Sequence, residues 1–198
     1  MSKTKAILIL SSLFLLIFLG SKSCVYVDYQ LDLRNKPWAY SSDPEASLLI
    51  GRWQGTFTDP DGVQHQLEMQ IDEPTPWEER NKKWMQRRRA KRKVRNRNPR
   101  GFDGFAYTTV NGVRDTMELW GSVQESDFQQ FSFHIRPLDG KYRTGFTISQ
   151  TSGTWQNDQM QLITHCTYHR EGGAGYSDSA DPRFEQRSPF VMKRVEAD

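Results

Sequence analysis

The stretch VQHQLEMQI, residues 63–71, decides the fold. Apolar residues and His65 occupy its odd positions, and Gln or Glu occupies every even position. Alternation with a period of two is typical of a β-strand with one buried face. The tetrapeptide DPDG at 59–62, a strong turn sequence, links this strand to the run LLIGRWQGTF at 48–57. The two runs therefore predict an antiparallel hairpin.

Alternating runs separated by turn sequences continue toward the C-terminus. Asn111-Gly112 separates two apolar-patterned runs, which is the strongest short hairpin signal because both residues tolerate a positive φ. Further alternating runs are FQQFSFHIRPL (128–138), YRTGFTIS (142–149) and residues 160–168, and a last apolar run covers 190–195. A meander of this kind closes into a barrel or folds into a sandwich, since closure removes exposed edges. We expect an all-β fold, an antiparallel meander β-barrel of about eight strands with one inserted basic α-helix.

The N-terminus predicts export. Lys3 and Lys5 precede an apolar run over 6–20, which is short for a transmembrane helix and fits a signal peptide. Ser21 and Ser23 then precede Cys24, and this arrangement resembles the bacterial lipobox, whose cysteine becomes a diacylated N-terminus. We therefore expect lipidation at Cys24, with ordinary cleavage or an uncleaved anchor as the alternatives.

The chain is thus expected to comprise a signal peptide (1–23), a tether (24–47) with a short strand over 25–33, and a barrel domain (48–198) carrying a helical insertion at 73–100. The expected location is the cell envelope, with the domain held at a membrane by its N-terminal lipid.

Charge is distributed unevenly. Twelve basic residues and no acidic one lie between Arg80 and Arg100, whereas the rest of the chain has 15 basic and 24 acidic residues. Thr75 as N-cap, Pro76 at the first helical position and Glu78 closing a capping box predict a helix over about 76–95.

This basic helix predicts an anionic partner. Aromatic side chains among arginines and lysines suit a lipid interface or a nucleic acid, and the targeting segment argues against nucleic acid. The residues expected to contact an anionic lipid or an acidic envelope partner are Trp77, Trp84, Arg87, Arg88, Arg89, Lys91, Arg92 and Lys93. The alternative is a solvated helix whose two tryptophans pack on the barrel.

Gly51-Arg52-Trp53 opens the first long strand. Here the sequence resembles the calycins, that is, lipocalins and related small barrels, whose first strand carries Gly-x-Trp. The resemblance implies that Gly51 permits a tight bend, that Trp53 plugs the closed end, and that a basic residue after the last strand, Arg194 or Lys193, packs across Trp53. The alternative is that Trp53 is an ordinary core aromatic.

Catalysis has little support. The sequence has no Gly-x-Ser-x-Gly, His-Glu-x-x-His or Gly-Lys-Ser/Thr motif, so we expect no enzyme and no cofactor. His165 and His169 share a strand face but lie about 13 Å apart, too far for one metal ion. Cys166 alternates with apolar residues and is expected to be a buried thiol, free to pair with Cys24 only if Cys24 is not acylated.

Two functions remain. The first is a binding protein that holds a small apolar ligand inside the barrel, and the second is an interaction protein whose filled barrel presents the basic helix. The core distinguishes them, because an interior filled by Phe131, Phe133, Phe146 and Trp120 would leave no room for a ligand.

Overall fold

The computed structural model describes residues 26–27, 29–74, 100–142, 145–170, 175–176 and 181–195. Its strands are β1 (Gly51–Thr58), β2 (Gln64–Ile71), β3 (Gly101–Val110), β4 (Val113–Val123), β5 (Gln130–Pro137), β6 (Gly145–Gln156), β7 (Gln159–His169), β8 (Gly175–Tyr176) and β9 (Arg187–Val195). A 3-10 helix, η1 (Pro182–Phe184), precedes β9.

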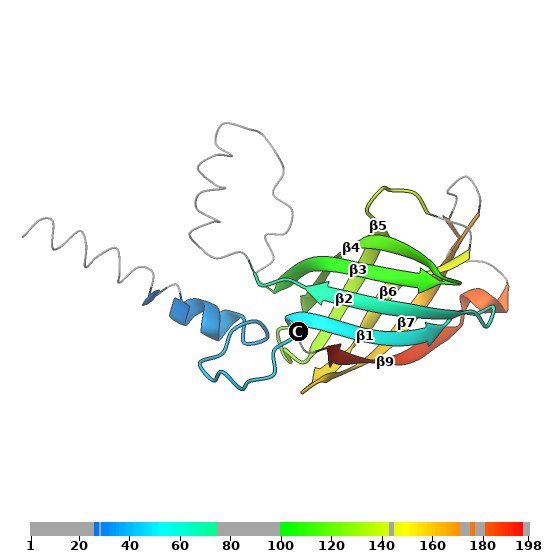
Figure 1. The fold of residues 1–198 in the computed structure, drawn as a ribbon. Coiled ribbons are helices and arrows are strands. Elements are labelled where there is room, and N and C mark those ends of the chain that lie inside the picture. The colour runs from blue at the N-terminus through cyan, green and yellow to red at the C-terminus, as the bar shows by residue number, and fades with distance from the viewer. Residues whose placement is uncertain are drawn as a thin grey trace, which may run out of the picture.

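The strands form one closed antiparallel barrel (Figure 1). Each of β1 to β6 pairs with its neighbour in the chain, β6 pairs with β7, and β9 lies between β7 and β1. The two-residue β8 pairs only with the last residues of β7, so eight strands make the wall. The prediction of an antiparallel eight-stranded meander barrel is confirmed. The basic helix expected at 76–95 lies outside the described residues.

The turns follow local sequence chemistry. Asn111 and Gly112 both have positive φ, 49° and 78°, as a tight hairpin between β3 and β4 requires. Asn157 has a φ of 53° in the turn between β6 and β7. At the β1–β2 turn, Asp59 Oδ1 accepts hydrogen bonds from the backbone N–H groups of Asp61 and Val63, both at 2.9 Å. These short turns keep consecutive strands adjacent.

Alternation fills the interior. On β2, Leu67, Met69 and Ile71 are at most 2% exposed, while the residues between them face outward. A register shift between Ile148 and Gln150 marks a β-bulge in β6. The bulge absorbs one residue, so the buried positions change from even to odd numbers along that strand.

Of the four side chains whose burial would fill the interior, Phe131, Phe133 and Phe146 are buried, but Trp120 is not in the interior. Met117 and Leu119 on β4 face inward, so strict alternation turns Trp120 to the outer surface. There its ring stacks on His134, with centroids 5.9 Å apart, and the Arg136 guanidinium lies 5.7 Å from its centroid.

The segment before the barrel departs from the sequence expectation. Residues 29–35 form a helix, so the short strand expected over 25–33 is wrong. Trp38 and Leu49 are fully buried, so the described part of the expected tether folds back onto the barrel. No helix among the described residues is both long and apolar enough to cross a bilayer.

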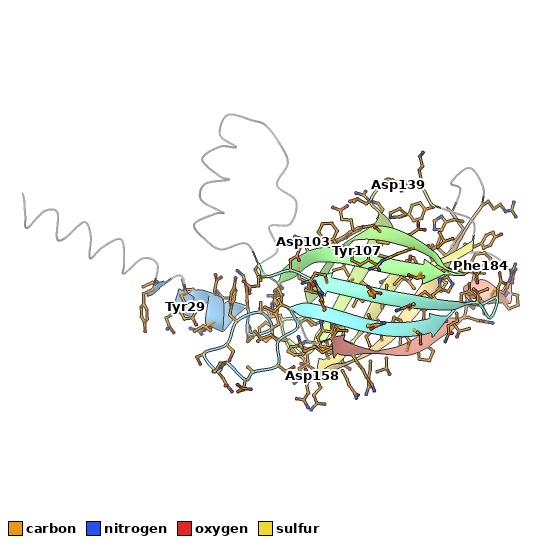
Figure 2. The ribbon with its side chains drawn as sticks, in the orientation of Figure 1. Tyr29, Asp103, Tyr107, Asp139, Asp158 and Phe184 are labelled. Carbon is orange, nitrogen blue, oxygen red and sulfur yellow. The ribbon has the colours of Figure 1, made fainter. Side chains whose placement is uncertain are left out.

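The barrel therefore has two different ends. At the closed end, β1 begins, β9 finishes and residues 36–50 cover the interior. At the open end lie the β1–β2 turn, the β3–β4 hairpin, the β5–β6 loop and η1. Figure 2 shows Phe184 of η1 at the end opposite to Tyr29 and its helix.

Candidate functional site

The closed end is filled by buried aromatic side chains that pack against one another. Trp53, 1% exposed, donates its indole N–H to the carbonyl of Leu49 at 2.9 Å. The Leu49 N–H in turn bonds the Trp38 carbonyl at 2.8 Å. Trp38 packs edge-on against Phe102, and Phe102 against Phe131, with ring centroids 6.0 and 6.1 Å apart. This chain of contacts fills the described interior of that end with packed side chains.

Arg194 ties this packed end together. Its guanidinium carbon lies 4.3 Å from the centroid of the Trp53 ring. It donates to the carbonyls of Leu48 and Ile50 and to Asp158 Oδ1, the last two at 2.9 and 2.7 Å. Gly51 has a φ of 118°, and a Cβ there would come within 2.9 Å of the Arg194 guanidinium. Gly51, Trp53 and Arg194 thus form one cluster, whereas Lys193 faces outward.

A cavity of about 380 Å³ enters the barrel from the open end. Its apolar wall combines five side chains from four strands, β1, β4, β5 and β6. These side chains are Phe57, Met117, Pro137, Phe146 and Ile148. Val113 at the rim is 60% exposed, as is Leu138 in the adjoining loop, so apolar surface continues outward from the mouth. A volume of this size falls in the range of small-molecule sites.

A buried polar pair lies in this cavity. Asp59 Oδ2 and His65 Nε2 are 2.9 Å apart, and their side chains are only 5% and 7% exposed. Phe57 stacks on the imidazole, with centroids 4.6 Å apart and an interplanar angle of 17°. The turn fixes the carboxylate through two backbone N–H groups, so the pair is held rigidly. Such a pair offers a ligand one oriented polar contact among apolar walls.

Cys166, also buried in the interior, does not supply a nucleophile. Burial and the nearby charge of Asp59 raise the pKa of its thiol to about 12. At neutral pH the thiol therefore stays protonated, and a protonated thiol is a poor nucleophile.

The η1 helix covers part of the mouth. Arg183 donates to Asp61 in the β1–β2 turn at 2.8 Å and to Asp181 at 2.7 Å. Hydrogen bonds from Arg183 lower the pKa of Asp181. Phe184 contacts the Phe146 ring at a centroid distance of 5.9 Å. The segment before β9 is thereby tied to the first turn of the barrel across the rim.

His169 and Tyr142 lie beside the mouth. Their rings are parallel and 4.0 Å apart, and His169 is only 6% exposed. Burial lowers the pKa of His169, so its neutral form is favoured. Its Nδ1 has no hydrogen-bond partner among the described residues.

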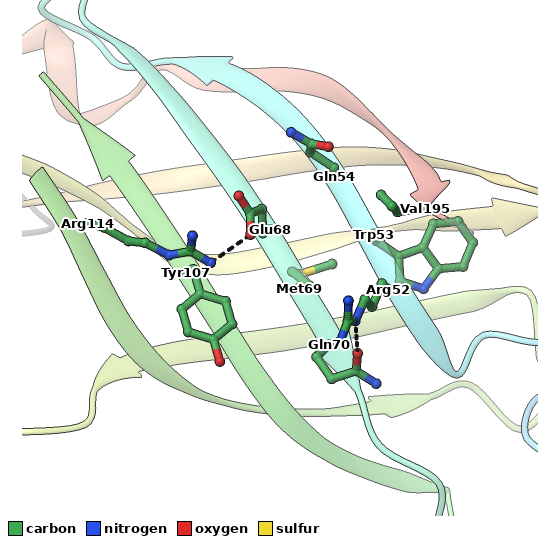
Figure 3. Close-up of a pocket in the computed structure, with 9 residues that line it drawn as sticks. All are labelled: Arg52, Trp53, Gln54, Glu68, Met69, Gln70, Tyr107, Arg114 and Val195. Carbon is green, nitrogen blue, oxygen red and sulfur yellow. Dashed lines mark hydrogen bonds and ion pairs between the residues drawn. The ribbon is translucent and has the colours of Figure 1, made fainter. Parts of the chain in front are cut away.

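A second hollow, of about 410 Å³, lies on the outer surface of β1 to β4 (Figure 3). Arg114 bonds Glu68 at 2.8 Å and stacks on Tyr107 at 4.4 Å, while Arg52 bonds Gln70 at 3.2 Å. These polar side chains largely satisfy one another on an exposed sheet face. Surface pairs of this kind are common and contribute little energy.

The remaining predicted site residues lie elsewhere. Cys24 and the basic set from Trp77 to Lys93 fall outside the described residues. Among the part of the chain that is described, no three His, Cys, Asp or Glu side chains converge as a metal site. His165 and His169 are accordingly not gathered with a third ligand.

Sequence reasoning missed the Asp59–His65 pair. DPDG was interpreted as a turn and His65 as one position of an alternating strand. The available signal was a histidine at an inward position, six residues after an aspartate that ends the preceding strand.

Comparisons with known proteins add little beyond this geometry. No family model matches the sequence, and no curated protein matches it significantly. Similar solved structures include a de novo designed fluorescence-activating β-barrel, at 12% identity and a TM-score of 0.39, covering 74% of this chain and 93% of that one. A redesigned β-barrel is 17% identical with a TM-score of 0.44, covering 79% and 100%. Another redesigned barrel, bound to DFHBI, is 15% identical with a TM-score of 0.37, covering 74% and 94%.

Proposed function

We propose that this protein is a lipocalin-like binding protein that holds a small, mainly apolar ligand in the open end of its barrel. The observation that carries the proposal is the contrast between a packed end and an end with a cavity of about 380 Å³. Apolar walls supply the binding energy, because burying apolar surface is the dominant favourable term in ligand association. The Gly51, Trp53 and Arg194 cluster supports the lipocalin-like assignment, since it has the arrangement that the calycin resemblance implies.

The test uses matched tryptophan substitutions. Ile148, 3% exposed, lines the cavity, whereas Ile163 on β7 is 48% exposed on the outer surface. The full chain in neutral-lipid nanodiscs is dialysed against 3-phenylpropan-1-ol, and empty nanodiscs correct for partitioning into lipid. Ile148→Trp should weaken binding by at least about ten-fold by filling the cavity, and Ile163→Trp should leave it unchanged. Equal binding by wild type and both variants would place the ligand elsewhere.

We further propose that the domain is exported and held at a membrane through a lipid on Cys24. The charged, apolar and small-residue order of residues 1–24 supports this. Exposed apolar side chains on the described part that follows, namely Tyr26, Val27, Tyr29 and Leu31, suit a position close to a lipid surface. Cys24→Ser should release the mature domain into the soluble fraction and abolish incorporation of labelled fatty acid. Unchanged fractionation, with no fatty acid incorporated by the wild type, would contradict lipidation.

A second candidate is binding to an anionic envelope surface through residues 80–100. The charge run favours it, with twelve basic residues and no acidic one. β2 ends and β3 begins at the closed end, so the described residues that flank this segment lie on the side of the N-terminal helix. Replacing Arg87, Arg88, Arg89, Lys91, Arg92 and Lys93 with Gln should abolish salt-sensitive sedimentation with anionic vesicles and preserve the β circular dichroism signal. Equal recovery of the wild type on neutral and anionic vesicles at low salt would end this candidate.

A further inference from the structure

The Asp, Glu, Lys and Arg side chains in the described lining of the cavity are all carboxylates. They are those of Asp59, Asp61 and Asp115. The described lining contains no lysine or arginine, and His65 is its one histidine. Since Arg183 bonds Asp61 at the rim and Asp115 also has an interaction partner, we discount the charges of both.

Asp59 is the one buried carboxylate in the described lining of this cavity. Three contacts hold it: two backbone N–H groups on Oδ1 and the His65 imidazole on Oδ2. An ionised carboxylate has about four acceptor positions, so these three contacts leave Oδ2 with the capacity to accept one more hydrogen bond. Its side chain is only 5% exposed, so water competes weakly for that position.

The charge of Asp59 also reaches across the interior. It contributes to raising the pKa of the Cys166 thiol, which lies on β7. In the barrel wall, β9 separates β7 from β1, the strand that leads into Asp59. Asp115 lies on the same inward face of β4 as Met117, closer to the mouth. The polar end of the cavity is therefore electronegative, and Phe57, Met117 and Ile148 form its apolar part.

Charges interact more strongly in a cavity that excludes water than they do in solution. A cationic head beside Asp59 gains an attraction and a hydrogen-bond acceptor. A carboxylate head at the same place is repelled and finds no guanidinium or ammonium among the described lining residues. An uncharged hydroxyl is neither repelled by Asp59 nor strongly attracted to it.

We propose that the open-end cavity selects amphiphiles headed by a protonated amine and discriminates against those headed by a carboxylate. The inference rests on the proposed function, because it names the ligand class of the same cavity. The amine is held at Asp59, with Asp115 nearer the entrance, and the apolar body lies along Phe57, Met117 and Ile148.

Three probes with one skeleton test the inference: 3-phenylpropylamine, 3-phenylpropan-1-ol and 3-phenylpropanoate. Each is dialysed near neutral pH against the full chain in neutral-lipid nanodiscs, with empty nanodiscs as the blank. The amine should bind at least about ten-fold more tightly than the carboxylate, with the alcohol between them. Equal or tighter binding of the carboxylate would overturn the inference while the proposed function stands. Binding of none of the three would overturn both.

Variants locate the effect. Asp59→Asn should remove the preference for the amine over the carboxylate while retaining the affinity for the alcohol. Because Asp59 also holds the β1–β2 turn, the circular dichroism signal of the same variant is recorded and should be retained. Glu185→Gln, an exposed open-end change outside the cavity lining, removes the same charge and should leave the preference intact. A preference that survives Asp59→Asn, or one lost equally in Glu185→Gln, would overturn the assignment.

Discussion

The two ends of the barrel are built on opposite principles. At the closed end, aromatic rings pack edge-on from Trp38 through Phe102 to Phe131, and Arg194 joins Trp53 to residues 48–50 and to the β6–β7 turn. At the open end, the interior is only partly filled and contains a carboxylate and an imidazole. Close packing stabilises a fold, whereas a cavity with an oriented polar group forgoes packing energy. The difference indicates that stability is concentrated at the closed end, and it places the proposed binding site at the open end.

The largest expected effect is the loss of the plug. Trp53→Ala should lower the free energy of unfolding by about 3–5 kcal/mol, because it leaves a large cavity in well-packed surroundings. Trp120→Ala removes the same side chain from the outer surface, where stacking on His134 contributes at most about 1.5 kcal/mol. Urea unfolding followed by circular dichroism measures both. Comparable losses in the two variants would mean that Trp53 has no special role.

The next effect concerns Arg194. Arg194→Gln should cost about 1.5–3 kcal/mol, the range for hydrogen bonds to charged groups, since the carbonyls of Leu48 and Ile50 lose a donor. Arg194→Lys should recover little of this stability. An ammonium group lacks the planar set of donors that bonds two carbonyls and Asp158 while the guanidinium lies over the Trp53 ring. Full recovery by lysine in thermal unfolding would show that charge alone matters there.

Two glycines compare the ends directly. Gly51→Ala forces a side chain into a φ of 118° and against Arg194, and should cost about 1–3 kcal/mol. Gly62→Ala at the open end has a φ of 81° and open space around the new methyl group, so only the backbone term applies, about 1 kcal/mol. Denaturant midpoints of the two variants rank these costs. A larger loss for Gly62→Ala would contradict the tighter construction of the closed end.

The smallest effect is a pH dependence at the open end. Because burial lowers the pKa of His169, the folded protein binds a proton there less readily than the unfolded chain does. Stability from this residue is therefore complete above the unfolded pKa of about 6.5 and is lost as the pH falls below it, by at most about 1.4 kcal/mol per pH unit. His169→Phe keeps a ring against Tyr142 and should flatten the acid limb of the stability profile. His134→Phe, at an exposed histidine on the barrel surface, should not.

These comparisons also separate what a single sequence can predict from what it cannot. Alternation and turn chemistry predicted the barrel, because period-two burial and Asn-Gly turns act over a few residues. The condition for a filled interior included Trp120, but the alternation of Met117 and Leu119 assigns that side chain to the outer face. The burial of Trp38 depends on its contact with Phe102 in β3, far along the chain, which local patterns do not contain.

The candidate site was harder to predict than the fold. Gly51, Trp53 and Arg194 carry a sequence pattern, and the structure brings them together. No sequence pattern marks the cavity, since its walls come from six strands, β1 to β6, and depend on closure of the barrel. Asp59 and His65 are neighbours only because the turn reverses the chain between them.

Methionine methyl resonances measure the contrast between the ends most directly. Met117 lines the open-end cavity, whereas Met160 lies at the closed end and is fully buried. In the full chain labelled with ¹³C-methyl methionine in neutral-lipid nanodiscs, saturating 3-phenylpropylamine should shift the Met117 methyl resonance and leave that of Met160 in place. A shift of Met160 equal to or larger than that of Met117, or no shift of either, would contradict ligand binding at the open end of the barrel.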